Sequence, residues 1–315
     1  MKISILDALT LGGDVTFEMF DKFGEVRIYE KTVAENVEKI LADTDIAIVN
    51  KIKLNADNLK LAKQLKLICV TATGYDNIDI EYCENHGIGV CNVCGYSTDS
   101  VAQVTVAAAL SLITNLMQFD RYVKSGKYTQ SGVQNCLTPV FHEIAGMTWG
   151  IVGMGNIGRK TAQAAAALGA NVIAYSRTRR GDFEYTDIDD LCRRSDIISV
   201  HLPLNGGTRG IISRERIALM KKSAVLLNVA RGAVIDEAAA AEAILDGKIG
   251  GLGVDVYSTE PMPSDSPYQA VLECKNVIFT PHMAWGAYEA RIRCLTEIAK
   301  NIDAFIAGEK RNRVV

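Results

Sequence analysis

The segment 150–158, with the sequence GIVGMGNIG, constrains the fold of this chain more than any other stretch. Gly153, Gly155 and Gly158 form a G-x-G-x-x-G pattern directly after an apolar run and at the start of a helical pattern. In that setting the first glycine allows a tight turn, the second lets the backbone approach a diphosphate, and the third lets the helix pack closely on the strand. The segment therefore predicts a βαβ unit with an anion site at the N-terminus of its helix.

A regular alternation of apolar strands and helical segments surrounds this motif. We expect strands at 150–153, 171–175, 196–201, 224–229, 251–256 and 277–280. We expect helices between them at 157–168, 188–194, 213–219 and 237–245. Six parallel strands joined by crossovers predict a complete dinucleotide-binding domain.

The first hundred residues show a second alternation of the same kind. Expected strands lie at 3–6, 26–29, 45–49, 67–70 and 89–91, and expected helices at 32–41 and 55–64. A long helix at 100–116 leaves this region, and one amphipathic helix at 286–307 closes the chain. The sequence thus predicts an α/β protein with two Rossmann-like parallel-sheet domains, one flavodoxin-like and one dinucleotide-binding, and a cleft between them. We assign 1–99 plus 286–315 to the first domain and 100–285 to the second.

Composition excludes several classes of partner. The formal net charge is -3 and hydrophobic residues make up 48% of the chain, so neither nucleic acid nor a membrane is expected to bind. Polar residues interrupt the most apolar segment, 101–117, which favours a buried helix over a membrane span. Cys91 and Cys94 form a single C-x-x-C without a second ligand pair, so no metal site is predicted. Reduced thiols favour a cytoplasmic protein.

The strand after the glycine motif indicates which dinucleotide binds. Backbone amides near Asn156 and Ile157 are expected to face the diphosphate. About 20 residues further on, an acid usually holds the ribose 2′-OH, but this chain has Ser176 there. A small hydroxyl beside Arg177 and Arg179 suits a 2′-phosphate, so NADP(H) is favoured, with NAD(H) possible. The alternative is that these arginines belong to a solvated loop.

Three polar side chains follow the C-terminal ends of successive predicted strands. Arg231 occurs in NVARGAVID, Glu260 in GVDVYSTEP and His282 in TPHMAW. Reduction of a 2-keto acid needs a cation for the carboxylate, which Arg231 can supply, and a proton donor for the carbonyl oxygen, which His282 can supply. Glu260 can orient the imidazole and favour its charged form. The three residues are therefore the predicted catalytic set.

These motifs, taken together, resemble the D-isomer-specific 2-hydroxyacid dehydrogenase family over essentially the whole chain. The resemblance rests on ATGYDNID (72–79), SVAQ (100–103), GMGNIG (153–158), HLPLNGGTRGII (201–212), NVARGAVID (228–236), GVDVYSTEP (253–261) and TPHMAW (280–285). Within the family, the motifs are similar to those of the glycerate dehydrogenase and hydroxypyruvate or glyoxylate reductase group.

The resemblance implies further contacts with the cofactor. It places Asp255 at the nicotinamide carboxamide and Thr208 at the dinucleotide. It also implies that the backbone of Val229, Ala230 and Arg231 contacts the cofactor. Family members are typically homodimers built around the cofactor domains, so a homodimer is expected.

The resemblance also implies a substrate site. Thr73, Gly74 and Tyr75 would form a substrate loop contributed by the other domain, which makes 1–99 plus 286–315 the substrate-binding domain. Arg231 and His282 would bind the same substrate. Trp285 would narrow the pocket, and core packing is its alternative role.

Several functions remain open at this point. The expected reaction is reduction of glyoxylate or hydroxypyruvate to the D-2-hydroxy acid, and larger 2-keto acids of the D-lactate type are its nearest alternative. A dinucleotide-sensing regulator on the same scaffold is a second alternative. Formate oxidation on a similar fold usually has a glutamine at the position of Glu260, so the glutamate argues against it.

Overall fold

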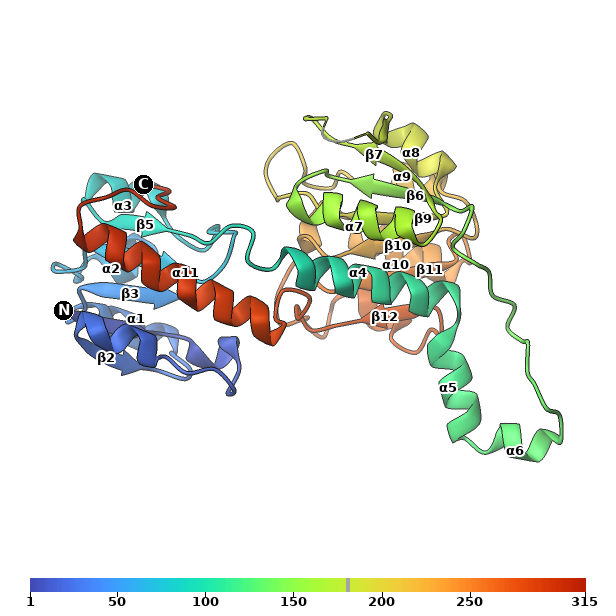
Figure 1. The fold of residues 1–315 in the computed structure, drawn as a ribbon, viewed down its shortest axis with the longest axis horizontal. Helices are drawn as coiled ribbons and strands as arrows, with labels where there is room; N and C mark the ends of the chain where they lie inside the picture. The colour runs from blue at the N-terminus through green and yellow to red at the C-terminus, as the bar shows by residue number, and fades with distance from the viewer. Residues whose placement is uncertain (180–181) are drawn as a thin grey trace. The chain divides into compact units, whose positions relative to one another are not determined.

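The computed structural model describes residues 1–179 and 182–315, which form two compact units (Figure 1). Unit 1 comprises Met1–Ser97 and Gly286–Val315, so it is built from both ends of the chain. Unit 2 comprises Thr98–Trp285. Each unit contains one parallel sheet covered by helices, which confirms the expected fold class.

Unit 1 contains a five-stranded parallel sheet with the order β2-β1-β3-β4-β5. Its strands are β1 (Lys2–Ile5), β2 (Glu25–Ile28), β3 (Ile46–Val49), β4 (Leu67–Val70) and β5 (Gly89–Cys91). This is the flavodoxin order, in which the chain reverses its direction of winding after β2. All of β3 and β4 is buried, as expected of central strands covered on both faces.

Helices cover both faces of this sheet. They are α1 (Ala34–Leu41), α2 (Ala56–Leu59), α3 (Ile80–Asn85) and α11 (Tyr288–Ile306), with 3-10 helices η1 (Ala8–Leu11) and η2 (Glu18–Phe23). Helix α11 packs against β4 and η2. The predicted helix at 55–64 is wrong beyond Leu59, because tight turns there bury Leu59, Ala62 and Leu65, three residues apart.

Unit 2 contains a seven-stranded parallel sheet with the order β12-β11-β10-β9-β6-β7-β8. Its strands are β6 (Thr148–Val152), β7 (Asn171–Tyr175), β8 (Glu184–Tyr185), β9 (Ile197–Val200), β10 (Val225–Asn228), β11 (Gly251–Val254) and β12 (Val277–Phe279). The winding reverses between β6 and β9, which is the ligand-binding position in such sheets. The expected count of six strands is one short, because two-residue β8 is too short for a periodic signal.

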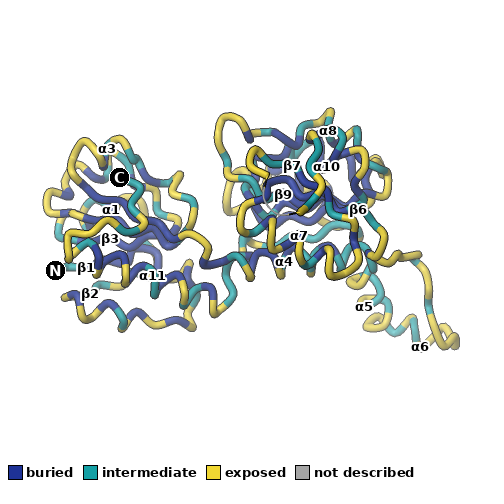
Figure 2. Tube along the Cα trace, turned by 45° about the horizontal axis from the view of Figure 1, so that its top comes forward, coloured by how far each residue is buried: buried dark blue, intermediate teal, exposed yellow. Residues whose placement is uncertain are grey.

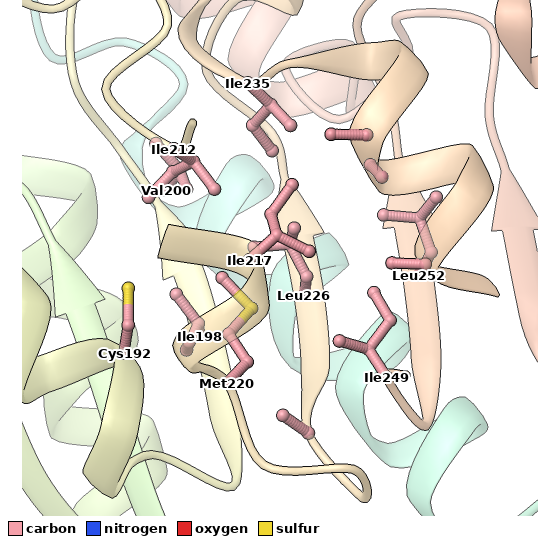
Figure 3. Close-up of a cluster of buried hydrophobic side chains, with 14 of the residues drawn as sticks. Cys192, Ile198, Val200, Ile212, Ile217, Met220, Leu226, Ile235, Ile249 and Leu252 are labelled. Carbon is pink, nitrogen blue, oxygen red and sulfur yellow. The ribbon is translucent and has the colours of Figure 1, made fainter. Parts of the chain in front are cut away.

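Two buried layers cover the sheet of unit 2. Helices α4 (Thr98–Ile113) and α7 (Asn156–Ala167) contact one face, and α8 (Ile188–Arg194), α9 (Arg214–Leu219) and α10 (Glu237–Leu245) contact the other. Short 3-10 helices η3 (Gly232–Val234) and η4 (Pro267–Val271) follow β10 and β11. Figure 3 shows the second layer, in which Ile198 and Leu226 face Ile217 and Met220. Successive residues of a central strand point alternately toward the two layers, so both faces of the strand are buried and most of its residues are apolar.

Residues 115–143, which we call the arm, leave the body of unit 2. The predicted helix at 100–116 instead ends at Ile113, because Asn115 adopts a left-handed conformation with φ 53°. The arm then contains α5 (Leu116–Lys124) and α6 (Lys127–Ser131), neither of which has a buried residue (Figure 2). Among the described helices none is by itself long and apolar enough to cross a membrane, and α4 and α5 meet that criterion only as a pair bent by 64°.

A buried polar chain crosses the centre of unit 2. Trp149 Nε1 donates to Ser199 Oγ at 3.0 Å, and Nε2 of His201 lies 3.0 Å from the same oxygen. The other ring nitrogen of His201, Nδ1, is enclosed and has no hydrogen-bond partner among the described residues. Although part of the residue reaches the surface, this enclosure disfavours the charged ring and lowers the pKa of His201 to about 3. His201 is therefore neutral near pH 7.

We expect His201 to make the protein sensitive to mild acid. The unfolded chain takes up a proton near pH 6.5, whereas folded His201 does so only near pH 3. The free energy of unfolding should therefore fall as the pH drops below 6.5, by roughly 2 kcal/mol between pH 7 and pH 5. Urea denaturation at both pH values should show a smaller loss in His201→Gln than in wild type. His86→Gln, at an exposed position of unit 1, should keep the wild-type loss; an unchanged loss in His201→Gln would contradict this account.

Candidate active site

The glycine motif forms a close-packed turn at the point where the sheet of unit 2 reverses its winding. Gly153 has φ 104°, and a Cβ there would lie 2.9 Å from the His201 carbonyl oxygen. A Cβ at Gly158 would lie 1.9 Å from the Gly153 oxygen. Both positions therefore require glycine for the turn and helix α7 to meet. A Cβ at Gly155 would meet nothing within 4 Å, so the space beside this residue is open.

The open space lies at the N-terminus of α7. Gly155 is the N-cap residue, and no side chain of the described chain caps this helix. The first-turn amides of Asn156 and Ile157 have no carbonyl partner within the helix, and the helix dipole adds positive potential there. An uncapped helix end beside an open glycine fits the diphosphate of a nicotinamide dinucleotide.

The loop after β7 carries the residues predicted to select the dinucleotide. Ser176 follows the strand and is half-buried, and Arg177 and Arg179 are exposed. The guanidinium carbon of Arg179 lies 5.7 Å from the ring centroid of Tyr185, in a cation–π arrangement. Arg180 lies outside the described residues. Among residues 176–179, the part of this loop described directly after β7, there are two cations and no acid.

Thr208 holds its own turn together. Its hydroxyl donates to the Pro203 carbonyl at 2.6 Å and accepts from the Asn205 amide at 2.8 Å. The side chain is buried. In this structure the Thr208 hydroxyl forms its hydrogen bonds within the turn. The contact of Thr208 with the dinucleotide that the family resemblance implies stays a prediction.

A buried asparagine shapes the turn that carries Arg231. Asn228 Oδ1 accepts from the Ala230 amide at 3.1 Å, and its Nδ2 donates to the Arg231 carbonyl at 2.9 Å. Val229 is half-buried within this turn, and Arg231 Nη1 donates to the Ala230 carbonyl at 2.8 Å. Sequence reasoning did not single out Asn228. Its signal is a polar residue that ends a fully buried strand.

Asp255 organises the loop that follows β12. Its Oδ1 accepts from Thr280 Oγ1 at 2.6 Å and from the Met283 amide at 2.9 Å. Its Oδ2 accepts from the Ala284 amide at 3.0 Å. The side chain is 3% exposed, and these three donors compensate for the burial of its charge. The implied contact of Asp255 with a nicotinamide stays a prediction; the observed role is support of this loop.

Glu260 and His282 form a close pair. Nδ1 of His282 lies 2.6 Å from Glu260 Oε2, and the two side chains are only 20% and 30% exposed. Because an ionised carboxylate can only accept, Nδ1 carries the hydrogen. The other oxygen, Oε1, accepts from the Tyr257 amide at 3.1 Å. His282 has φ 52°, a left-handed conformation that is costly for a side chain with a Cβ and is frequent at functional sites.

The structure brings the loops of the predicted catalytic residues to one edge of the sheet. Strands β10, β11 and β12 are neighbours, and Arg231, Glu260 and His282 each follow one of them. The turn after Arg231 also touches the loop of Glu260, since a Cβ at Gly232 would lie 2.0 Å from the Tyr257 carbonyl carbon. A guanidinium and a carboxylate-paired imidazole at one edge can bind an acid and transfer a proton.

The remaining predicted substrate residues lie in two places. Thr73, Gly74 and Tyr75 belong to unit 1, in the loop after β4. Thr73 Oγ1 donates to the Val93 carbonyl at 2.9 Å, and the Tyr75 side chain is exposed. Trp285, at the end of unit 2, is half-buried.

The chain matches known proteins along its length. Residues 106–284 match the family described as D-isomer specific 2-hydroxyacid dehydrogenase, NAD binding domain. The chain is 35% identical to glycerate dehydrogenase of Methylorubrum extorquens, over 99% of this chain and 98% of that protein. It is 35% identical to glyoxylate reductase of Thermococcus litoralis, over 93% and 90%.

A solved structure of D-lactate dehydrogenase from Aquifex aeolicus, with NAD and lactic acid, superposes with a TM-score of 0.85. It is 31% identical to this chain, and the match covers 98% of this chain and 96% of that one. The sequence matches and the fold therefore indicate the same family as the sequence motifs. The chain belongs to the D-isomer specific 2-hydroxyacid dehydrogenase family, oxidoreductases that use a nicotinamide dinucleotide.

Proposed function

We propose that this protein reduces a small 2-keto acid, glyoxylate or hydroxypyruvate, to the corresponding D-2-hydroxy acid. The observation that carries the proposal is the 2.6 Å contact between His282 Nδ1 and Glu260 Oε2 at the C-terminal edge of the sheet. Because Nδ1 faces the carboxylate, we assign proton transfer to the other imidazole nitrogen, Nε2. This pairing is the arrangement that a general acid requires, with the ring held in one orientation by a fixed carboxylate.

Each member of the set has a separate task. The Arg231 guanidinium binds the substrate carboxylate through two parallel hydrogen bonds. His282 holds a proton at Nε2 and gives it to the carbonyl oxygen as negative charge develops there. Glu260 stabilises the charged imidazole and, through the Tyr257 amide, is itself held in place. Bound NAD(P)H supplies the hydride to the carbonyl carbon.

A small substrate is supported by two relatives and by the residues near the catalytic histidine. Glycerate dehydrogenase and glyoxylate reductase both match most of this chain. Trp285, three residues beyond His282, would leave room for a hydrogen or a hydroxymethyl group on the substrate. Thr73, Gly74 and Tyr75 would contact the same substrate. The similarity to a D-lactate dehydrogenase makes a larger 2-keto acid the second candidate.

Purified protein should oxidise NADPH or NADH in the presence of glyoxylate or hydroxypyruvate, with lower kcat/KM for pyruvate and phenylpyruvate. His282→Ala should lower kcat by about 10²- to 10⁴-fold, because the proton donor is lost, while the Kd for the dinucleotide changes little. Absorbance at 340 nm and dinucleotide titration measure the two quantities. His86→Ala, at an exposed histidine outside the arm, is the control. No turnover with any of these acids would favour a dinucleotide-sensing regulator.

The loop after β7 supports NADP(H) as the preferred cofactor. A 2′-phosphate would be repelled by an acid at position 176, and a serine is present there. Arg177 and Arg179 are exposed on the same loop and can form charge-assisted hydrogen bonds with that phosphate. The nearby Glu184 carboxylate is bound by Arg194 at 2.7 Å, which reduces its repulsion of an anion.

The two arginines should contribute mainly to the affinity for NADPH. Arg177→Ser together with Arg179→Ser should raise the KM for NADPH by roughly 10- to 100-fold, as expected for one or two lost charge-assisted bonds. The KM for NADH should change less than twofold. Arg193→Ser, which removes an exposed arginine from α8, controls for net charge. Equal changes for both dinucleotides would contradict the assignment of these side chains to the 2′-phosphate.

The arm supports a homodimer as the working form. Its exposed apolar side chains are Leu116, Met117, Val123, Val133, Leu137, Val140 and Phe141. An apolar surface of this extent is costly in water and marks an interaction site. A symmetric pairing of two copies buries both arms at once and closes on itself.

Charged residues on the arm should separate the dimer. Leu137→Asp and Val140→Asp, at positions that are 67% and 72% exposed, should convert the protein to a monomer in light scattering after size exclusion. Leu61→Asp places the same charge at an exposed position of unit 1 and should remain dimeric. A wild-type monomer at tens of micromolar would overturn the homodimer, and dimeric arm variants would place the interface elsewhere.

A further inference from the structure

Tyr257, a residue outside the predicted set, bonds to Glu260 through its backbone amide and to Thr280, two residues before His282, through its hydroxyl. We propose that Tyr257 is a positioning residue, whose amide and hydroxyl together set the location of the carboxylate relative to the imidazole. The inference rests on the proposed reduction of a keto acid, because it concerns how the proton donor of that reaction is held.

The first connection runs through the backbone of Tyr257. Its N–H donates to Glu260 Oε1 at 3.1 Å, three residues further along the same loop. The second carboxylate oxygen, Oε2, is the one that receives His282 Nδ1–H. Each oxygen thus has its own donor, and the amide prevents the carboxylate from rotating away from the ring.

The second connection runs through the side chain of Tyr257. Its hydroxyl donates to the Thr280 carbonyl at 3.0 Å, and Thr280 lies two residues before His282. Glu260 follows β11 and His282 follows β12, so the tyrosine joins the loops of two different strands. This bond acts together with those that Asp255 forms with Thr280, Met283 and Ala284, and it is the one that ties the residue bonded to Glu260 directly to the His282 loop.

The loop of His282 needs this support because its backbone is strained. His282 has φ 52°, and such a conformation persists only where the surroundings hold it. The His282 amide donates to the Asp255 carbonyl at 2.8 Å, and the Asp255 carboxylate binds Thr280 Oγ1 and the Met283 amide. Asp255 thus holds the His282 loop at the end of β11. Tyr257 adds a further bond, to the carbonyl of Thr280.

Tyr257 is suited to donate at every pH at which the enzyme would be assayed. Burial raises the pKa of its hydroxyl to about 12, so the proton is present. Its ring packs against Tyr268 and Phe279, with centroids 6.3 and 6.4 Å away. A phenylalanine would keep this ring packing and the amide contact with Glu260, and would remove only the bond to Thr280.

The same cluster contains a matched control. Tyr268 is fully buried, and its hydroxyl has no hydrogen-bond partner among the described residues. Tyr268→Phe therefore removes a hydroxyl from the same ring cluster without breaking a bond to the catalytic loops. Any effect of Tyr257→Phe that arises from ring packing or loss of polarity alone should appear in Tyr268→Phe as well.

The test compares these variants in keto acid reduction at saturating dinucleotide. Tyr257→Phe should lower kcat by about three- to tenfold, the effect of one misplaced hydrogen bond. The KM for the keto acid and the Kd for the dinucleotide should stay within twofold. The solvent deuterium isotope effect on kcat should rise, because proton donation by His282 becomes slower relative to the other steps. Tyr268→Phe should match wild type in all of these quantities.

A double-mutant cycle identifies the pair through which Tyr257 acts. In a Glu260→Ala background the carboxylate is absent, so Tyr257→Phe should cost less than twofold in kcat. The same loss in both backgrounds would overturn the inference, as would wild-type kcat and isotope effect in Tyr257→Phe. These outcomes are distinct from failure of the proposed function, in which the wild-type protein itself turns over no keto acid.

Discussion

The parallel alignment of all seven strands in unit 2 is the constraint on which the candidate site depends. Parallel strands bring every C-terminal end to one edge, so the loops after β6, β10, β11 and β12 emerge together. The glycine turn that is predicted to bind the dinucleotide follows β6, and the three predicted catalytic residues follow the other strands. Residues separated by more than 120 positions in the chain thereby reach the same C-terminal edge of the sheet.

At that edge, buried polar side chains hold the loops that carry the predicted catalytic residues. Asn228 shapes the turn of Arg231 from below, and Asp255 binds three donors of the His282 loop. A buried carboxylate is costly, and here its burial is offset only if the loop adopts the conformation that supplies the donors. The Asp255 carboxylate thus holds His282 in its strained backbone conformation. It takes no part in the proposed proton transfer.

The two histidines of the sheet edge illustrate how environment separates their roles. His201 follows β9, with Nε2 3.0 Å from Ser199 Oγ and Nδ1 enclosed, so desolvation keeps the ring neutral. His282 instead has Nδ1 2.6 Å from the Glu260 carboxylate. In the proposed reaction it is the histidine that gives a proton to the substrate. The difference rests on what each ring contacts, since the residue type is the same.

Local pattern alone determined much of this protein. Strand periodicity predicted β4, β5 and β7 to the residue, and the glycine spacing predicted the turn and helix around Gly153 and Gly158. Elements without a periodic signal were missed: two-residue β8, and the break at Asn115 that turns the long helix into an arm. The bonds from Tyr257 and Asp255 to Thr280 join segments that are 23 and 25 residues apart, so no local pattern contains them. Only tertiary structure decided that a tyrosine hydroxyl reaches the strand end before His282, because that contact exists only once β11 and β12 pair.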